Sequence, residues 1–145
     1  MNNSIIVSLA NSLEYKFISE FYSRFEEDIH VAENETVFVA HVEKEIVGVV
    51  RLVNESTYFV LRTLIVSPDF QKQGIGSALT RTLIAHVPTD MPIYCLPYPH
   101  VRIFYGHFGF KEISPEALPD VLKQRYYEYK KEFPVTAMML AHQQK

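Results

Sequence analysis

The hydrophobic and polar positions of this chain follow two different periods, and each stretch of constant period predicts one element. Runs of β-branched and aromatic residues with a period of about two predict strands. These runs cover residues 5–8, 35–41, 46–53, 58–66, 91–96, 110–113 and 135–140. The polar residues 43–45 separate the second run from the third, so we expect these two strands to form a hairpin. The run at 58–66 is the longest, and we expect it at the centre of a sheet.

Apolar residues that recur every three or four positions predict helices between these strands. After Ser12, the residues Leu13, Phe17, Phe21 and Phe25 have this spacing and predict one apolar face of the first helix. Further helices are expected at 77–86, 101–108 and 116–132.

The composition favours one domain. The chain has 145 residues, of which 48% are hydrophobic, which is enough for one core, and no repeat or linker interrupts it. We therefore expect a single domain over residues 1–145.

The formal net charge is −3 and the basic residues are scattered, which argues against nucleic acid as a partner. The single cysteine, Cys95, excludes an internal disulfide framework and suits a reducing compartment, and we expect it to pack inside a strand.

Two absences in the sequence bear on location and chemistry. No apolar run approaches the roughly 18 residues of a membrane-spanning helix, and the first residues lack the basic flank and long apolar centre of a secretory signal. We therefore expect a cytoplasmic protein with no membrane partner. The six histidines show no paired spacing with cysteine or carboxylates, so we expect no metal site.

A glycine-containing turn is the strongest candidate for chemistry. Residues 71–76, Gln-Lys-Gln-Gly-Ile-Gly, follow the strand that ends at Val66 and precede a predicted helix. Glycine lets the backbone turn sharply, so several N–H groups can point at one anion at the helix N-terminus. A Walker loop is excluded because no glycine-lysine pair occurs, and the bulky Leu79 disfavours a dinucleotide fingerprint. The alternative is a surface turn that only starts a helix.

Two motifs in this order resemble the GNAT superfamily of N-acetyltransferases, which bind acetyl-coenzyme A. The first is the Gln-x-x-Gly-x-Gly string, preceded by Val-Ser-Pro-Asp-Phe, which is similar to the pyrophosphate-binding motif of that family. The second is Phe-Tyr-x-x-x-Gly-Phe at 104–110. One departure is Tyr98, where members of the family often have asparagine. The resemblance implies an α/β (α+β) fold with a mixed, mostly antiparallel central sheet, flanking helices and a splayed coenzyme cleft.

The resemblance also implies a set of coenzyme-binding residues and acetyl-CoA as co-substrate, without a metal. In the family, backbone N–H groups at the positions from Lys72 to Ser77 hold the pyrophosphate, and the strand end from Leu64 to Val66 pairs with the pantetheine arm. The expected cofactor-binding residues are Leu64, Ile65, Val66, Gln71, Lys72, Gln73, Gly74, Ile75, Gly76 and Ser77. Hydrogen bonds to a charged group contribute roughly 1.5–3 kcal/mol each, so these amides require no basic side chain.

Tyr105 is the expected catalytic residue. In the family, the tyrosine at this position protonates the sulfur that leaves from coenzyme A. Ordinary pKa values of about 10 for a phenol and about 8.5 for a thiol make that transfer uphill by roughly 2 kcal/mol. A hydrogen bond that strengthens as charge develops on sulfur offsets this cost. The alternative is that Tyr105 only packs in an aromatic core with Phe104 and Phe108.

Arg62 stands where many relatives have a glutamate that helps to deprotonate the amine. Regular alternation would place Arg62, Leu64 and Val66 on one side of the strand. A guanidinium cannot act as a base, but its planar fork can bind a carboxylate, so we expect Arg62 to bind an acidic acceptor. The alternative is an internal ion pair, for instance with Glu55. Because Arg62 cannot be the base, water, a backbone carbonyl, Glu55 or His100 would accept the proton of the amine.

The expected function is acetyl transfer from acetyl-CoA to a primary amine of a small molecule, by direct attack. Leu-Arg-Thr-Leu-Ile-Val-Ser-Pro and the late Phe-Pro-Val-Thr-Ala-Met-Met-Leu are similar to GNAT enzymes that acetylate amino acids or amino-acid-like toxins, so an amino acid is one candidate acceptor. Three alternatives stay open: a peptide or protein N-acetyltransferase, a non-catalytic acyl-CoA sensor, and a scaffold that binds nothing. A homodimer also stays open.

Overall fold

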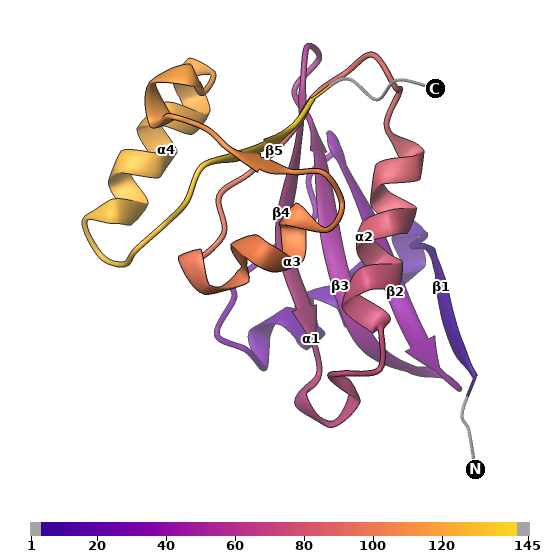
Figure 1. Ribbon diagram of the computed structural model, residues 1–145. Helices are drawn as coiled ribbons and strands as arrows, with labels where there is room; N and C mark the ends of the chain where they lie inside the picture. The colour runs from indigo at the N-terminus through magenta and orange to yellow at the C-terminus, as the bar shows by residue number, and fades with distance from the viewer. Residues whose placement is uncertain (1–3, 142–145) are drawn as a thin grey trace. The chain divides into compact units, whose positions relative to one another are not determined.

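In the computed structural model, which describes residues 4–141, seven strands form one mixed sheet (Figure 1). The strand order is β1-β2-β3-β4-β5-β7-β6. The strands are β1 (Ile5–Leu9), β2 (Glu35–Val42), β3 (Glu45–Asn54), β4 (Phe59–Val66), β5 (Ile93–Cys95), β6 (Lys111–Glu112) and β7 (Met138–Leu140). β4 and β5 pair in parallel, whereas β1 with β2, β2 with β3, β5 with β7 and β6 with β7 pair antiparallel. The predicted mixed, mostly antiparallel sheet is confirmed, with β4 at its centre.

Four α-helices and four short 3₁₀ helices connect the strands. The α-helices are α1 (Tyr15–Ser23), α2 (Ile75–His86), α3 (Arg102–Gly106) and α4 (Asp120–Lys130). The 3₁₀ helices are η1 (Ser12–Glu14), η2 (Pro68–Phe70), η3 (Pro99–Val101) and η4 (Pro115–Ala117). Three of the 3₁₀ helices begin with proline, whose fixed φ suits a first helical position. Within residues 4–141, no helix is long and apolar enough to cross a membrane.

The described chain divides into two compact units. The first runs to Ser56 and includes Leu61–Val87, and the second comprises Thr57–Val60 and the chain from Pro88 onward. The boundary falls inside β4, so this strand contributes residues to both units. That residues 1–145 form one domain stays a prediction.

In the first unit, α1 and α2 cover opposite faces of the sheet formed by β1, β2 and β3 (Figure 1). On the α2 face, the helix packs tightly on Gly48, where a Cβ would lie 3.1 Å from side-chain atoms of both Ile75 and Leu79. The α1 face buries a cluster that includes Ile18 and Phe21. The sheet is therefore a central layer between two helices, and Ile75, the first residue of α2, packs on it at Gly48.

The predicted apolar face of the first helix is only partly right. Leu13 and Phe17 are 85% and 57% exposed, whereas Ile18, Phe21 and Tyr22 form the buried face of α1. The reason is that η1 precedes α1, and its tighter 3₁₀ turn shifts the angular positions of the residues that follow. Asn11 accepts the Leu13 N–H and forms a capping box with Glu14, which fixes where this turn begins.

In the second unit, β7 lies between β5 and β6. Cys95 of β5 is opposite Met138 of β7, and its side chain is buried, as predicted. α4 buries Leu122 and Tyr126, whereas Val121 is exposed. The predicted strands and helices of this unit all occur, with ends that differ by a few residues.

Candidate functional site

The turn between β4 and α2 is fixed by side-chain and backbone hydrogen bonds. Ser67 N donates to Val47 O at 2.8 Å, which joins the end of β4 to β3. The Gln71 side-chain amide donates to Val66 O at 3.0 Å, so it closes the turn on the strand. Lys72 and Gly74 both have positive φ, at 65° and 83°. Gly74 adopts this conformation without a Cβ clash, which explains a glycine at this position.

The N-terminus of α2 presents unpaired backbone donors. Gly74 is the N-cap residue without a side-chain cap, and Ala78 N donates to Gly74 O at 3.0 Å as the first bond of the helix. The N–H groups of Ile75, Gly76 and Ser77 therefore have no acceptor within the helix. Together with the helix dipole, such donors favour an anion.

Ile75 anchors this helix N-terminus to the sheet. Its side chain is buried against the sheet at Gly48, whereas residues 71–74 before it are exposed. The row of N–H donors therefore starts at a buried, closely packed residue and continues through the half-buried Gly76 and Ser77. Such an arrangement holds the donors in place before a ligand binds, which reduces the ordering cost of binding.

β4 is kinked at Thr63, where φ is 53°. A β-branched residue in the left-handed region is a conformational outlier that costs about 1–2 kcal/mol. The regular alternation predicted for this strand is therefore wrong. Leu61 is buried, and the residues from Arg62 to Val66 are all half-buried. The predicted pantetheine-binding residues 64–66 follow the kink directly, and the parallel pairing of β4 with β5 covers Phe59 and Val60.

Two side chains bind Thr63 at the kink. The Tyr22 hydroxyl of α1 donates to Thr63 O at 2.7 Å. Arg51 of β3 donates from Nη2 to Thr63 Oγ1 at 2.9 Å and from Nη1 to Glu35 Oε1 at 3.0 Å. The side chains of Arg51 and Glu35 are only 7% and 9% exposed. A buried ion pair is weak evidence of stabilisation, because desolvation offsets much of its Coulomb attraction.

The protonation state of Tyr22 follows from its burial. Burial raises the pKa of Tyr22 well above its ordinary value, and the nearby Arg51 guanidinium only partly opposes this. The phenol is therefore protonated at neutral pH and remains a hydrogen-bond donor. The Nε atom of Arg51 is buried without a hydrogen-bond partner in the described structure. The cluster of Tyr22, Glu35, Arg51 and Thr63 is thus polar, buried and not fully satisfied.

Tyr105 lies on α3 in the second unit, and its side chain is 7% exposed. Its ring packs edge-to-face with Phe104 at 5.1 Å and with Phe110 at 5.7 Å between ring centroids. The amide of Phe110 donates to Tyr105 O at 3.3 Å as the chain leaves the helix. Of the aromatic packing described as the alternative, the contact with Phe104 is present, and this packing does not exclude proton donation.

Burial raises the pKa of Tyr105, and the nearby Cys95 adds to this shift when charged. Burial likewise raises the pKa of Cys95, so the thiol is protonated and behaves as an apolar side chain. The Tyr105 phenol is protonated at neutral pH. It can donate a hydrogen bond or a proton to a group that develops negative charge, but it cannot act as a base near pH 7.

The candidate residues for the acceptor lie in different environments. Arg62 is half-buried and has an interaction partner. Glu55, the predicted ion-pair partner, accepts a hydrogen bond from the Asn34 amide at 3.1 Å. Tyr98 is exposed and stacks on His100 with 5.7 Å between ring centroids, so both belong to one aromatic surface of the second unit. Which of these residues binds the acceptor stays a prediction.

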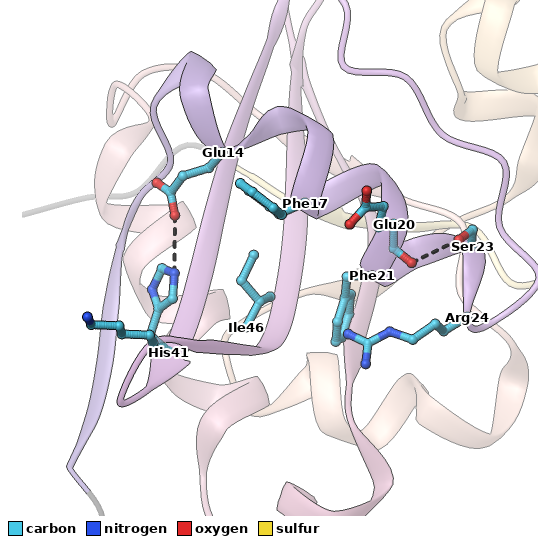
Figure 2. A pocket seen from close by; sticks show the side chains of 9 residues that line it. Glu14, Phe17, Glu20, Phe21, Ser23, Arg24, His41 and Ile46 are labelled. Atoms are coloured by element: carbon cyan, nitrogen blue, oxygen red, sulfur yellow. Dashed lines mark hydrogen bonds and ion pairs between the residues drawn. The ribbon is translucent and has the colours of Figure 1, made fainter.

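A groove of about 670 Å³ lies on the first unit beneath α1 (Figure 2). It is lined by Glu14, Phe17, Glu20, Phe21, Ser23, Arg24, His41, Lys44 and Ile46. His41 Nε2 lies 3.1 Å from Glu14 Oε2, and the Arg24 guanidinium lies 5.1 Å from the centre of the Phe21 ring. None of the residues predicted for coenzyme, acid or acceptor lines this groove, so it is a separate feature. Within residues 4–141, no three His, Cys, Asp or Glu side chains are grouped as metal ligands.

The sequence reasoning missed the buried polar cluster. The sequence analysis singled out neither Arg51, which lies within the strand predicted at 46–53, nor Tyr22, which lies beside the predicted apolar face of the first helix. One signal was available: a charged residue inside a strand that is otherwise apolar requires a buried partner. The partner itself, Glu35, is identified only by the pairing of β2 with β3.

A family model described as an acetyltransferase (GNAT) domain matches residues 8–131. This range contains the glycine turn, Arg62 and Tyr105. No curated protein sequence matches the chain.

Solved structures with the same fold come from several bacteria at low sequence identity. N-acetylglutamate synthase from Neisseria gonorrhoeae, complexed with coenzyme A and N-acetyl-glutamate, has a TM-score of 0.73 at 15% identity, over 99% of this chain and 36% of that one. The ribosomal-protein-S18-alanine N-acetyltransferase of Escherichia coli has a TM-score of 0.72 at 15% identity, over 98% and 96%. Rv2747 of Mycobacterium tuberculosis, solved with CoA, has a TM-score of 0.71 at 19% identity, over 94% and 98%. The chain thus spans about a third of the synthase it matches.

Proposed function

Because the chain belongs to the GNAT acetyltransferase family, we propose that it transfers an acetyl group from acetyl-CoA to a primary amine of a small molecule. The observation that carries this proposal is the set of unpaired amides at the start of α2, at the position of the family's pyrophosphate motif. The structures of N-acetylglutamate synthase and of Rv2747 described above were solved with CoA, which supports the same donor here.

The amides from Lys72 to Ser77 bind the pyrophosphate in this proposal, and the strand end from Leu64 to Val66 binds the pantetheine arm. The amine nitrogen attacks the thioester carbonyl carbon, whose oxygen accepts a hydrogen bond from a backbone N–H near Leu64. The C–S bond then breaks, and Tyr105 donates its proton to the sulfur. The proton lost by the amine passes to water or to a nearby base. Alignment of the two reactants supplies much of the rate, since effective molarities reach ~10⁵ M or more.

Burial raises the pKa of Tyr105, which keeps the phenol protonated but adds to the cost of transferring its proton to a thiolate. A protonated phenol is present across the neutral range, so no pH change is needed to prepare it. Transfer becomes favourable as negative charge develops on sulfur, because the hydrogen bond from the phenol strengthens in a buried site. Tyr105 is therefore a catalytic residue that acts on the leaving group rather than on the amine.

Arg62 binds a carboxylate of the acceptor in this proposal, which favours an amino acid. An α-amino group with a pKa near 8 is about one-tenth neutral at pH 7, so it needs little help to become a nucleophile. N-acetyl-glutamate is bound in one of the similar structures, and this supports an amino-acid acceptor. The ribosomal-protein alanine N-acetyltransferase favours the second candidate, a peptide or protein N-terminus.

Thiol release from acetyl-CoA, measured with a panel of amino acids, polyamines and peptides, tests this function. We expect turnover with acceptors that carry a carboxylate beside the amine. Tyr105→Phe should lower kcat by about 10²-fold or more, within the range for general acid catalysis, while the affinity for acetyl-CoA changes less than about twofold. The reason is that the variant loses only the proton donor and keeps the ring packing.

Tyr127→Phe is the matched control, because Tyr127 donates a hydrogen bond to Glu116 on the exposed side of α4. It should leave kcat unchanged. Equal turnover of wild type and Tyr105→Phe would contradict the acid role. Coenzyme binding without turnover of any acceptor would instead favour the acyl-CoA sensor, and a preference for polyamines would contradict the role of Arg62.

A further inference from the structure

The kink at Thr63 has an unusual position in the chain. Among residues 4–141, five non-glycine residues have positive φ, and four of them, Glu26, Glu43, Ser56 and Lys72, lie outside helices and strands. Thr63 alone of the five lies inside a strand. Its Cβ is branched, which makes the left-handed region least favourable for it. A conformation of this kind persists only where surrounding groups determine it.

Two independent groups determine it here. The carbonyl oxygen of Thr63 accepts the Tyr22 hydroxyl, and the Thr63 hydroxyl accepts Arg51 Nη2. Tyr22 comes from α1 and Arg51 from β3, so the kink is held from a helix and from a neighbouring strand. Glu35 of β2 holds the guanidinium in turn.

The geometry points to a positioning role for this cluster. We infer that Tyr22 and Arg51, with Glu35 behind Arg51, hold Thr63 in its left-handed conformation and thereby position residues 64–66 for the acetyl group. We call these three side chains the Thr63 clamp. The inference rests on the proposed function, in which the backbone at Leu64–Val66 binds the coenzyme arm and the thioester oxygen.

The clamp is built from polar groups although it is buried, and this combination needs a reason. Tyr22 has no exposed surface, and the two charged side chains of the clamp are more than nine-tenths buried. Charges held this far from water stabilise a fold poorly, and one donor of Arg51 stays without a partner. Apolar side chains would fill the same volume without that cost, but they could not bind the hydroxyl and the carbonyl of Thr63. The clamp therefore fits a requirement for one backbone conformation.

The test combines Tyr22→Phe with Thr63→Gly. Tyr22→Phe removes the donor to Thr63 O and keeps the ring. We expect kcat to fall about tenfold or more, because small misplacements of reacting groups cost up to about 10²-fold, while the affinity for acetyl-CoA stays within about twofold. Glycine adopts positive φ without strain, so in the Thr63→Gly background the added Tyr22→Phe change should lower kcat less than threefold.

Amide hydrogen exchange gives a readout that needs no substrate. In Tyr22→Phe, the amides of residues 64–66 should exchange faster than in wild type, and Tyr127→Phe, which loses an exposed tyrosine hydroxyl, should leave them unchanged. The inference is overturned if Tyr22→Phe leaves kcat and exchange at 64–66 unaltered, or if it lowers kcat equally with and without Thr63→Gly. A wild-type protein without turnover defeats the proposed function, but the exchange at 64–66 still decides whether the clamp holds the kink.

Discussion

Gly74 and Gly106 show how the same residue serves two different purposes. At neither position would a Cβ meet another atom within 4 Å, so space does not explain either glycine. Gly74 has a φ of 83°, which is strained for any other residue except asparagine or aspartate. Gly106 lies in α3, where alanine is the better helix former. Only the first glycine is required by the backbone.

We predict opposite effects for alanine at these two positions. Gly74→Ala should lower the free energy of unfolding by about 1–2 kcal/mol, because it places a Cβ in the left-handed region. It should also weaken acetyl-CoA binding, because relief of the strain moves the amides that follow. Gly106→Ala should raise the free energy of unfolding by about 0.5–1 kcal/mol. Urea titration and coenzyme titration measure both effects, and equal destabilisation by the two variants would contradict this account.

At the scale of elements, α1 depends on a buried face that a simple stripe does not describe. Ile18 is fully buried in the cluster with Val37 and Val49, whereas Leu13 and Phe17 project from the surface. Most of the stability of a helix this short comes from its packed face rather than from its own hydrogen bonds. The side chains at 18, 21 and 22 therefore hold α1 on the sheet.

We predict that alanine substitutions separate the two sets of residues. Ile18→Ala should lower the free energy of unfolding by about 2–5 kcal/mol, because it leaves a cavity in a closely packed cluster. Leu13→Ala, the matched control, should change it by less than about 0.5 kcal/mol, as expected for an exposed side chain. Chemical denaturation measures both. A larger effect at Leu13 than at Ile18 would show that the predicted stripe, and not the observed face, is buried.

The elements could be predicted from sequence because their signals are local. Period and flanking prolines located every strand. The glycine turn placed the start of the helix near residue 77, whereas α2 begins at Ile75, directly after Gly74. The Arg51 and Glu35 pair could not be located in this way, since 16 positions separate them and only the register of β2 on β3 brings them together. The kink at Thr63 was missed for the same reason: Tyr22, 41 positions away, binds it.

At the scale of the whole molecule, three buried groups link stability to alkaline pH. Burial raises the pKa of Tyr22, Tyr105 and Cys95 above the ordinary values, which are about 10 for tyrosine and about 8.5 for cysteine. As pH rises, the unfolded chain therefore releases these protons before the folded chain does. The stability is complete below the unfolded pKa values and is lost above them, by about 1.4 kcal/mol per pH unit for each proton.

We predict that the free energy of unfolding falls from about pH 9 upward. The loss should begin with Cys95 and become steeper above about pH 10, when the two tyrosines also contribute. Cys95→Ala should delay the onset by about one pH unit, because it removes the group with the lowest unfolded pKa. Urea titrations between pH 8 and 10.5 measure this, and an onset that is identical in wild type and Cys95→Ala would contradict the assignment.

The order of the last strands constrains how the polypeptide acquires its structure during synthesis. β6 is made before β7, yet its neighbour in the sheet is β7, which also completes the pairing of β5. β6 and the edge of β5 that faces β7 therefore keep their backbone donors and acceptors hydrated until Met138–Leu140 has been synthesised and can pair, although β5 can already pair with β4. The segment that carries Tyr105 lies between β5 and β6 in the chain, so its surroundings are completed only after β7 has paired with both strands.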